Sequence, residues 1–214
     1  MKKIAIFGAG GLGKEVACII NHINAQNLEW DFVGFFDDGK EKGLQISHFG
    51  EVLGNLGDLN SWSSPMNIIV AIGNPDTVKR LVQGITNPNI TFPNIIHPEV
   101  NFVDKSSLKI GKGNVIYRGC IFSCDVTIGD FNIFNNHTAL GHDVNVGSFN
   151  AFMPLTQISG ETTIGNENFF GVGSVVLQRI RIGDNTRIGA GSYVMRHTKG
   201  GHLYFGNPAK IVHF

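Results

Sequence analysis

The sequence lacks an excess of charge of either sign. Its 17 lysines and arginines balance 17 aspartates and glutamates, so the formal net charge of the 214-residue chain is +0 at pH 7. Proteins that bind nucleic acid or an anionic membrane surface usually carry a basic patch or a net positive charge. We therefore expect neither nucleic acid nor a membrane among the binding partners of this protein.

Cysteine and long apolar runs are also scarce. The three cysteines, Cys18, Cys120 and Cys124, are an odd number without metal-site spacing, which is typical of a reduced compartment. The first apolar run, Ile4 to Phe7, is too short for a signal peptide or a membrane span. We therefore expect a cytoplasmic protein, and a hydrophobic content of 42% is enough for one or two domains with a proper core.

Glycine, in contrast, is abundant, with 28 residues, and many of them belong to a repeat. From residue 110 onward an apolar residue occupies every sixth position: Ile110, Ile116, Phe122, Ile128, Phe134, Leu140, Val146, Phe152, Ile158, Ile164, Phe170, Val176, Ile182, Ile188 and Val194. This spacing fits neither an amphipathic helix nor a two-sided strand, but it is typical of a solenoid built from hexapeptides. Three hexapeptides form one coil, and the motifs IGKGN, IGDFN, VGSFN, IGNEN and IGDNT recur with that longer period of 18 residues. We therefore predict five stacked coils.

The first part of the chain has a different pattern. The segment KKIAIFG predicts a buried strand, GAGGLG a glycine turn and GKEVACIINHIN an amphipathic helix. The segments DFVGFFDD and MNIIVAIGN predict two more strands, and PDTVKRLVQGI predicts a second helix with Pro75 near its start. We predict a small α/β Rossmann-like domain over residues 1–92 and a β-solenoid with a C-terminal tail over residues 93–214.

The glycine turn matches a phosphate-binding pattern. Gly8, Gly10 and Gly13 satisfy G-x-G-x-x-G between a strand and a helix, and Asp37 follows the next strand. A nicotinamide enzyme is one interpretation, but a dinucleotide fold needs a second mononucleotide half, and the solenoid leaves no chain for it. A second interpretation is that the glycines only form a tight turn. We favour a ligand that carries a nucleotide.

The motifs GAGGLGKE, FFDD, VAIGN, IIHPEV, LGHDV and GNPAK follow one another along the whole chain. In this order they resemble the bacterial sugar acyltransferases of the sialic-acid O-acetyltransferase and nucleotide-amino-sugar N-acetyltransferase type, whose hexapeptides form a left-handed β-helix. The resemblance implies an acetyl-CoA-dependent enzyme that acetylates an amino group of a nucleotide-linked sugar in bacterial surface-glycan biosynthesis. A sugar O-acetyltransferase of the sialic-acid type is the alternative. The resemblance also implies a homotrimer with active sites between neighbouring solenoids.

The resemblance extends to individual residues. His142, followed by Asp143, matches the catalytic histidine of the family and the acid after it. The positions that match nucleotide-sugar contacts are Gly8, Gly10, Gly11, Leu12, Gly13, Asp37, Asp38 and Gly73, and those that match the acetyl-CoA side include Val172, Ala190 and Lys210. Two positions depart from the pattern: Leu12 stands where many members have a histidine, and Ala151 where some have a second active-site histidine.

The coil period adds two further candidates for acetyl-CoA binding. Residues 18 apart lie above one another at about 4.8 Å per coil, so Cys124, His142, Gly160, Gln178 and Arg196 form one column. Gly160 leaves room for a thioester and can donate its N–H to an oxyanion, while Arg196 can reach the CoA phosphates. An imidazole, with an ordinary pKa of about 6.5, can act as the general base for direct transfer. We expect the thiols of Cys120 and Cys124 to be structural.

Two other classes of function stay open. His137 and His142 have the spacing H-x₄-H, which resembles part of the metal site of hexapeptide carbonic anhydrases, so a zinc hydrolyase is a rival. The third histidine of that site would stand at Asn101, so the set is incomplete and we expect no metal. A trimer that binds a nucleotide sugar without acting on it is the other rival, although the intact His142 column favours an enzyme. We expect His22 and His97 to be structural or surface residues.

Overall fold

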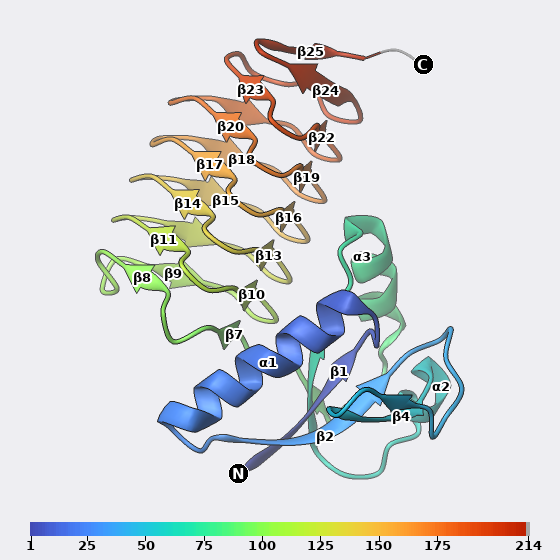
Figure 1. Ribbon diagram of the computed structural model, residues 1–214. Coiled ribbons are helices and arrows are strands. Elements are labelled where there is room, and N and C mark those ends of the chain that lie inside the picture. Colours follow the sequence, from blue (N-terminus) through green and yellow to red (C-terminus); the bar gives the residue numbers. More distant parts are fainter. Residues whose placement is uncertain (213–214) are drawn as a thin grey trace. The chain divides into compact units, whose positions relative to one another are not determined.

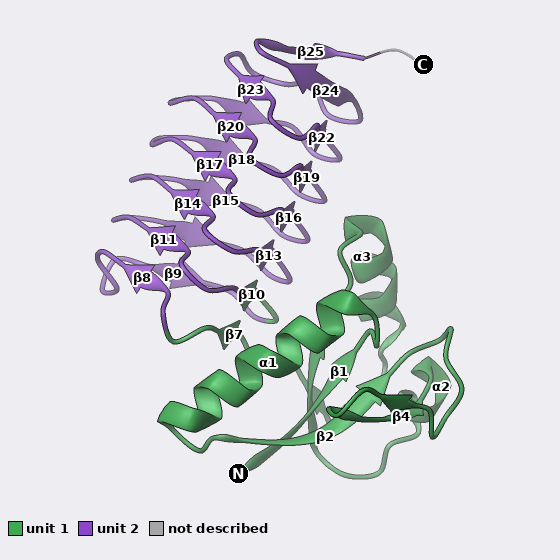
Figure 2. Cartoon of the chain, in the orientation of Figure 1, with its two compact units in different colours: residues 1–98, 113–115 green, residues 99–112, 116–214 purple. Residues whose placement is uncertain are grey.

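The computed structural model describes residues 1–212, and the chain divides into two compact units (Figure 2). The first unit comprises residues 1–98 and 113–115, and the second comprises residues 99–112 and 116 onward. None of the helices within residues 1–212 combines the length and the hydrophobicity that a membrane crossing requires.

The first unit contains a six-stranded sheet with the order β3-β4-β2-β1-β5-β6 (Figure 1). Its strands are β1 (Lys2–Phe7), β2 (Trp30–Phe36), β3 (Gln45–Ile46), β4 (Gly50–Gly54), β5 (Met66–Val70) and β6 (Ile90–Thr91). Every neighbouring pair is parallel except β3 and β4. The three strands expected from the sequence are β1, β2 and β5, whereas the short strands β3, β4 and β6 were not anticipated.

Two helices of this unit lie where the apolar spacing predicts them. Helix α1 (Gly11–Gln26) buries Val16, Ile19 and Ile20, the spacing of one helix face. Helix α3 (Pro75–Gly84) starts with proline in its first turn, and Oδ1 of Asn74 accepts the N–H of Thr77. A third helix, α2 (Leu56–Asn60), was not anticipated because it is only one turn long.

The ends of three parallel strands meet at one edge of this sheet. Strands β2 and β5 lie on opposite sides of β1, so the strand order reverses there. The N–H of Gly8 donates to the carbonyl of Phe36, and the N–H of Ala71 donates to the carbonyl of Phe7. This is the position at which open α/β sheets bind their ligands.

A parallel β-solenoid with three sheets (Figure 1) makes up the second unit, except that its first strand, β7, and Val115 of β10 are counted with the first unit. The sheet orders are β25-β24-β22-β19-β16-β13-β10-β7, β23-β20-β17-β14-β11-β8 and β21-β18-β15-β12-β9. The short strands are β7 (Ile95–Ile96), β8 (Asn101–Phe102), β9 (Lys109–Ile110), β10 (Val115–Ile116), β11 (Ile121–Phe122), β12 (Thr127–Ile128), β13 (Ile133–Phe134), β14 (Ala139–Leu140), β15 (Asn145–Val146), β16 (Ala151–Phe152), β17 (Gln157–Ile158), β18 (Thr163–Ile164), β19 (Phe169–Phe170), β20 (Val175–Val176), β21 (Arg181–Ile182), β22 (Arg187–Ile188) and β23 (Tyr193–Val194).

The hexapeptide series coincides with the strands. Each of its fifteen apolar residues is the second residue of one strand from β9 to β23, and all of them are buried except Ile110, which is half-buried at the start of the series. Five periods of three strands are therefore confirmed. The strands are too short to hold together alone, so burial of this series is the main source of stability in the unit.

Columns of identical side chains keep the coils in register. Oδ1 of Asn132 accepts the backbone N–H of Asn150 at 2.9 Å, and Oδ1 of Asn150 accepts that of Asn168 at 2.9 Å. The rings of Phe134 and Phe152 are stacked with centroids 4.7 Å apart. Because each coil satisfies polar groups of the next, a shift in register would leave buried amides without partners.

The end of the described chain is a hairpin. Strands β24 (Leu203–Gly206) and β25 (Ala209–Ile211) pair antiparallel, and β24 also pairs with β22 in parallel. The hairpin thus extends the sheet that contains β7, β10 and β22, and β24 covers the edge of β22.

Candidate active site

His142 and Asp143 form a hydrogen-bonded pair in the turn between β14 and β15. Nδ1 of His142 lies 2.8 Å from Oδ2 of Asp143, and the two side chains are 47% and 57% exposed. Because a carboxylate only accepts hydrogen bonds, Nδ1 carries the proton of the neutral ring and Nε2 keeps its lone pair. The pair therefore presents a base, Nε2, at the surface of the solenoid.

Gly160 lies one coil beyond His142, directly against its ring. A Cβ atom on Gly160 would lie 2.5 Å from Nε2 and 2.7 Å from Cε1 of His142. Among residues 1–212, no backbone acceptor receives the N–H of Gly160, whereas the N–H of Glu161 donates to the carbonyl of His142 at 2.8 Å. The site therefore combines a free base with a free backbone donor, the two groups that acyl transfer requires.

The predicted acetyl-CoA residues lie at several levels of the solenoid. Val172 and Ala190 are in equivalent turns, after β19 and β22, and Val172 is 48% exposed. The glycines that follow them, Gly173 and Gly191, have φ values of 66° and 63° with open space where a side chain would stand. These turns leave an uncovered surface along which an extended chain can lie.

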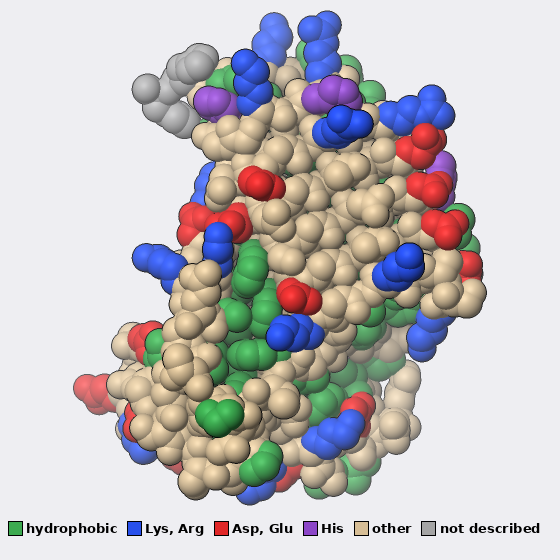
Figure 3. All heavy atoms as spheres, turned by 180° about the vertical axis from the view of Figure 1, so that it is seen from behind, with side chains coloured by type: hydrophobic (Ala, Val, Ile, Leu, Met, Phe, Trp, Pro, Cys, Tyr) green, Lys and Arg blue, Asp and Glu red, His purple; other side chains and the backbone are tan. Residues whose placement is uncertain are grey.

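Arg196 and Lys210 are brought together by the C-terminal hairpin. Both line a cavity of about 270 Å³, together with Met195, Pro208 and Ala209. Figure 3 shows that lysine, arginine and histidine side chains gather at this end of the solenoid. The cavity therefore offers two cations beside an apolar wall, a combination that suits a phosphorylated ligand.

The glycine loop of the first unit contains two kinds of glycine. A Cβ atom on Gly8 would lie 2.6 Å from the carbonyl oxygen of Ala71, and one on Gly13 would collide with the carbonyl oxygen of Gly8. Gly10 and Gly11 have open space instead. Gly8 and Gly13 therefore serve packing, whereas Gly10 and Gly11 leave the loop open to a ligand.

The start of α1 is suited to an anion. Gly10 is its N-cap residue and makes no side-chain capping hydrogen bond, and the first turn has no acidic residue. The first N–H groups of a helix lack intrahelical partners and carry partial positive charge. Gly73, in the loop after β5, also has open space, and Leu12 is half-buried in the first turn.

The two predicted aspartates contact backbone N–H groups. Oδ2 of Asp37 accepts the N–H of Ala9 at 2.8 Å, and Oδ1 accepts that of Gly39 at 2.9 Å. Oδ1 of Asp38 accepts the N–H of Leu56 at 2.8 Å. Asp37 thus holds the glycine loop to the end of β2, and Asp38 supports the start of α2.

Three further histidines and one cysteine have contacts that fit structural roles. The ring of His137 lies over Gly119, where a Cβ atom would be 2.5 Å from its Nδ1. His22 and His97 are partners of one another, with Nδ1 and Nε2 2.8 Å apart. Burial raises the pKa of the Cys120 thiol to about 12, so that thiol is protonated and is a poor nucleophile. Residues 1–212 contain no group of three metal-binding side chains.

Two charged side chains beside His142, Glu161 and Arg179, were missed in the sequence, and Gln178 was placed in the column of His142 without a role. Nε and Nη2 of Arg179 donate to Oε2 and Oε1 of Glu161 at 2.9 and 3.1 Å, and Nε2 of Gln178 donates to Oε1 at 2.8 Å. Hydrogen bonds from Arg179, and then from Gln178, hold the pKa of Glu161 below its ordinary value. The spacing of 18 between Glu161 and Arg179 was the available signal, because it places opposite charges on adjacent coils.

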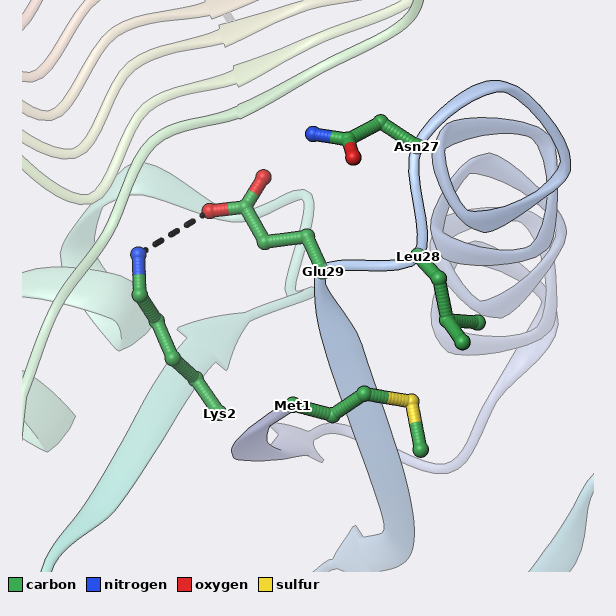
Figure 4. Close-up of a pocket in the computed structure, with 5 residues that line it drawn as sticks. All are labelled: Met1, Lys2, Asn27, Leu28 and Glu29. Atoms are coloured by element: carbon green, nitrogen blue, oxygen red, sulfur yellow. Dashed lines mark hydrogen bonds and ion pairs between the residues drawn. The ribbon is translucent and has the colours of Figure 1, made fainter.

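One further hollow contains none of the candidate residues. It has a volume of about 500 Å³ and is lined by Met1, Lys2, Asn27, Leu28 and Glu29 (Figure 4). Nζ of Lys2 lies 3.1 Å from Oε1 of Glu29, so its two charged side chains are paired with one another.

Comparisons with known families match both units. Residues 3–85 match the PglD N-terminal domain, and residues 161–196 match the bacterial transferase hexapeptide family with six repeats. A search of curated proteins finds no match.

Solved structures resemble the chain over its whole length. The acetyltransferase domain of PglB from Neisseria gonorrhoeae, in complex with acetyl coenzyme A, is 29% identical with a TM-score of 0.88, and the match covers 99% of each chain. PerB from Caulobacter crescentus, in complex with CoA and GDP-perosamine, is 27% identical with a TM-score of 0.84, over 100% of this chain and 98% of that one. WeeI from Acinetobacter baumannii, at 24% identity and a TM-score of 0.87 over 99% and 100%, shares the fold.

Proposed function

We propose that this chain, which belongs to the hexapeptide-repeat acyltransferases with a left-handed β-helix, transfers the acetyl group of acetyl-CoA to an amino group of a nucleotide-linked sugar in bacterial surface-glycan biosynthesis. The observation that carries the proposal is the His142–Asp143 pair, with Nε2 free beside the backbone N–H of Gly160. PglB with acetyl coenzyme A and PerB with CoA and GDP-perosamine support the two substrate classes.

The chemistry is direct transfer. The amine nitrogen attacks the thioester carbonyl carbon, the new C–N bond forms, and Nε2 of His142 takes the proton that the nitrogen loses. The N–H of Gly160 stabilises the oxyanion. The C–S bond then breaks, and the proton passes from His142 to the departing CoA sulfur. Asp143 keeps the imidazole in the tautomer that this sequence of proton transfers needs.

Each unit binds one substrate in this proposal. The N–H groups at the start of α1, next to Gly10 and Gly11, hold a phosphate of the nucleotide. Asp37, Asp38 and Gly73 follow strands that end at the same edge of the sheet, and in this proposal they contact the nucleotide sugar. Acetyl-CoA lies along the turns at Val172 and Ala190 and places its phosphates near Arg196 and Lys210.

The functional form in this proposal is a homotrimer in the cytoplasm. Apart from Phe205, the large exposed apolar side chains of the solenoid lie on or beside one sheet, from β8 to β23: Val103, Ile121, Leu155, Val172, Leu177, Tyr193 and Met195. Contiguous exposed apolar surface is typical of an interface. His142 follows β14 of the same sheet, so copies that pack there would enclose the site.

The experiment is an acetyl-transfer assay with the purified chain, acetyl-CoA and a panel of nucleotide-linked amino sugars. We expect release of one CoA thiol for each N-acetylated product identified by mass spectrometry, and a rate about 10²- to 10⁴-fold lower with His142→Ala. An ester product that hydroxylamine cleaves would show the O-acetyltransferase instead. Tight binding of a nucleotide sugar without turnover would show a non-catalytic protein.

A further inference from the structure

The feature on which this inference depends is the cluster of Glu161, Gln178 and Arg179, which lies beside the catalytic pair. Glu161 directly follows Gly160 and donates its N–H to the carbonyl of His142 at 2.8 Å. Gln178 occupies the position one coil beyond Gly160. Since Gly160 has no side chain, the side chain of Gln178 is the next one in the column after His142.

The orientation of the Gln178 amide follows from chemistry. Hydrogen bonds from Arg179, and then from Gln178, keep the pKa of Glu161 below its ordinary value, so Glu161 is a carboxylate that only accepts hydrogen bonds. The NH₂ group of Gln178 must therefore face Oε1 of Glu161, at 2.8 Å. Its carbonyl oxygen points away from Glu161, and among residues 1–212 no group donates to it.

The geometry of the cluster is well ordered, although an exposed ion pair adds little to the stability of the fold. The side chains of Arg179 and Glu161 are 74% and 37% exposed, and ion pairs exposed to this degree contribute little to folding. Arg179 nevertheless holds Glu161 with two parallel hydrogen bonds, which fixes the plane of the carboxylate. The result is an amide whose orientation is set by Glu161, which Arg179 holds in place, and whose oxygen is free.

An amine needs such an acceptor and a hydroxyl does not. A neutral primary amine has two N–H bonds, and only one proton passes to His142 during attack. The second N–H stays on the nitrogen of the new amide and requires an acceptor once water is displaced. A hydroxyl gives its single proton to His142 and has none left to donate.

We propose that the side-chain carbonyl of Gln178 accepts this second N–H and selects an amine over a hydroxyl, with Glu161 and Arg179 as positioning residues that hold the amide. The inference rests on the proposed acetyl transfer and names a determinant of its acceptor. The pantetheine arm of CoA also carries N–H groups, so the experiment separates the two possible donors.

The test compares the wild-type enzyme with Gln178→Met. This substitution keeps the length of the side chain and removes both the carbonyl and the NH₂ group of the amide. We expect kcat/KM for the amino sugar to fall about 10-fold, the scale of one neutral hydrogen bond, while the dissociation constant of acetyl-CoA is unchanged. Slow turnover of the matched hydroxyl sugar should be unchanged too. Retention of the wild-type kcat/KM, or a weakened affinity for acetyl-CoA alone, would overturn the proposal.

The positioning role has its own readout. Arg179→Met should lower kcat/KM for the amine about 3-fold, because a free Glu161 holds the amide less firmly, and should have no further effect in the Gln178→Met background. Arg181→Met, two residues away on the exposed side of β21, is the matched control and should be neutral. Equal losses from Arg179→Met in both backgrounds would contradict positioning through Gln178. A wild-type enzyme that acetylates no amine would contradict the proposed function itself.

Discussion

Gly160 and the imidazole of His142 lie on adjacent coils of the solenoid and are in direct contact, so closely that a methyl group on Gly160 would lie 2.5 Å from Nε2. The atoms that would have to move belong to a surface side chain that is 47% exposed. The ring can therefore yield without disturbing the core.

Gly160→Ala should consequently separate activity from stability. We expect kcat to fall about 10²-fold, because a displacement of about 1 Å at a reacting group costs that much, with a thermal unfolding midpoint close to that of the wild type. A crystal structure of the variant should show the ring rotated away from residue 160. Normal turnover in this variant would mean that His142 is not held where the reaction occurs.

His142→Ala should lower kcat about 10²- to 10⁴-fold, the usual scale for loss of a general base. The oligomeric state and the affinity for acetyl-CoA should stay the same, and both can be measured by sedimentation and calorimetry. His137→Ala is the matched control, since its ring lies over Gly119, and it should cost much less. Loss of activity with a chelator and recovery with zinc would instead identify a metal enzyme.

The two kinds of glycine in the loop give a paired experiment on nucleotide binding. Gly11→Val should raise KM for the nucleotide sugar far more than KM for acetyl-CoA, because the space at Gly11 is open and a side chain would occupy it. Gly13→Val should destabilise the first unit, since its Cβ atom would collide with the carbonyl oxygen of Gly8. Equal effects of Gly11→Val on both substrates would argue against a phosphate at this loop.

Arg196→Gln and Lys210→Gln should each weaken acetyl-CoA binding about 10-fold, the scale of one charge-assisted hydrogen bond. The two residues line one cavity, so the double variant should show the weakest dependence of affinity on salt. Titration with CoA fragments that lack phosphates should reveal no difference between the variants and the wild type. A difference that persists with these fragments would assign the two side chains to another part of the ligand.

The Glu161–Arg179 pair predicts a pH dependence of stability. The pKa of Glu161 is lowered from 4.5, first by Arg179, so the pair contributes stability that is present above pH 4.5 and is lost as the pH falls through the folded-state pKa. Glu161→Gln should therefore be less stable than the wild type near neutral pH and equally stable in strong acid. The difference should be small because both side chains are exposed, and thermal melts across the pH range will measure it. A difference that does not change with pH would contradict the ion pair.

The architecture could be predicted because its cause is periodic. An inward side chain every sixth residue must be apolar, so burial in the solenoid appears directly in the sequence, as at Phe134, Phe152 and Phe170. The same sixfold spacing predicted that His142 lies in a turn and that Gly160 lies one coil away from it.

The direction of each polar side chain could not be predicted in this way, because it depends on neighbours that are distant in sequence. Only the tertiary structure decided that Asp143 reaches Nδ1 of His142, and that Asp37 holds the N–H of Ala9. The same holds for the amide of Gln178, which is oriented by Glu161 on the adjacent coil. Apolar burial is non-directional and is set by local spacing, whereas hydrogen bonds are directional and are set by which coils and loops the fold brings together.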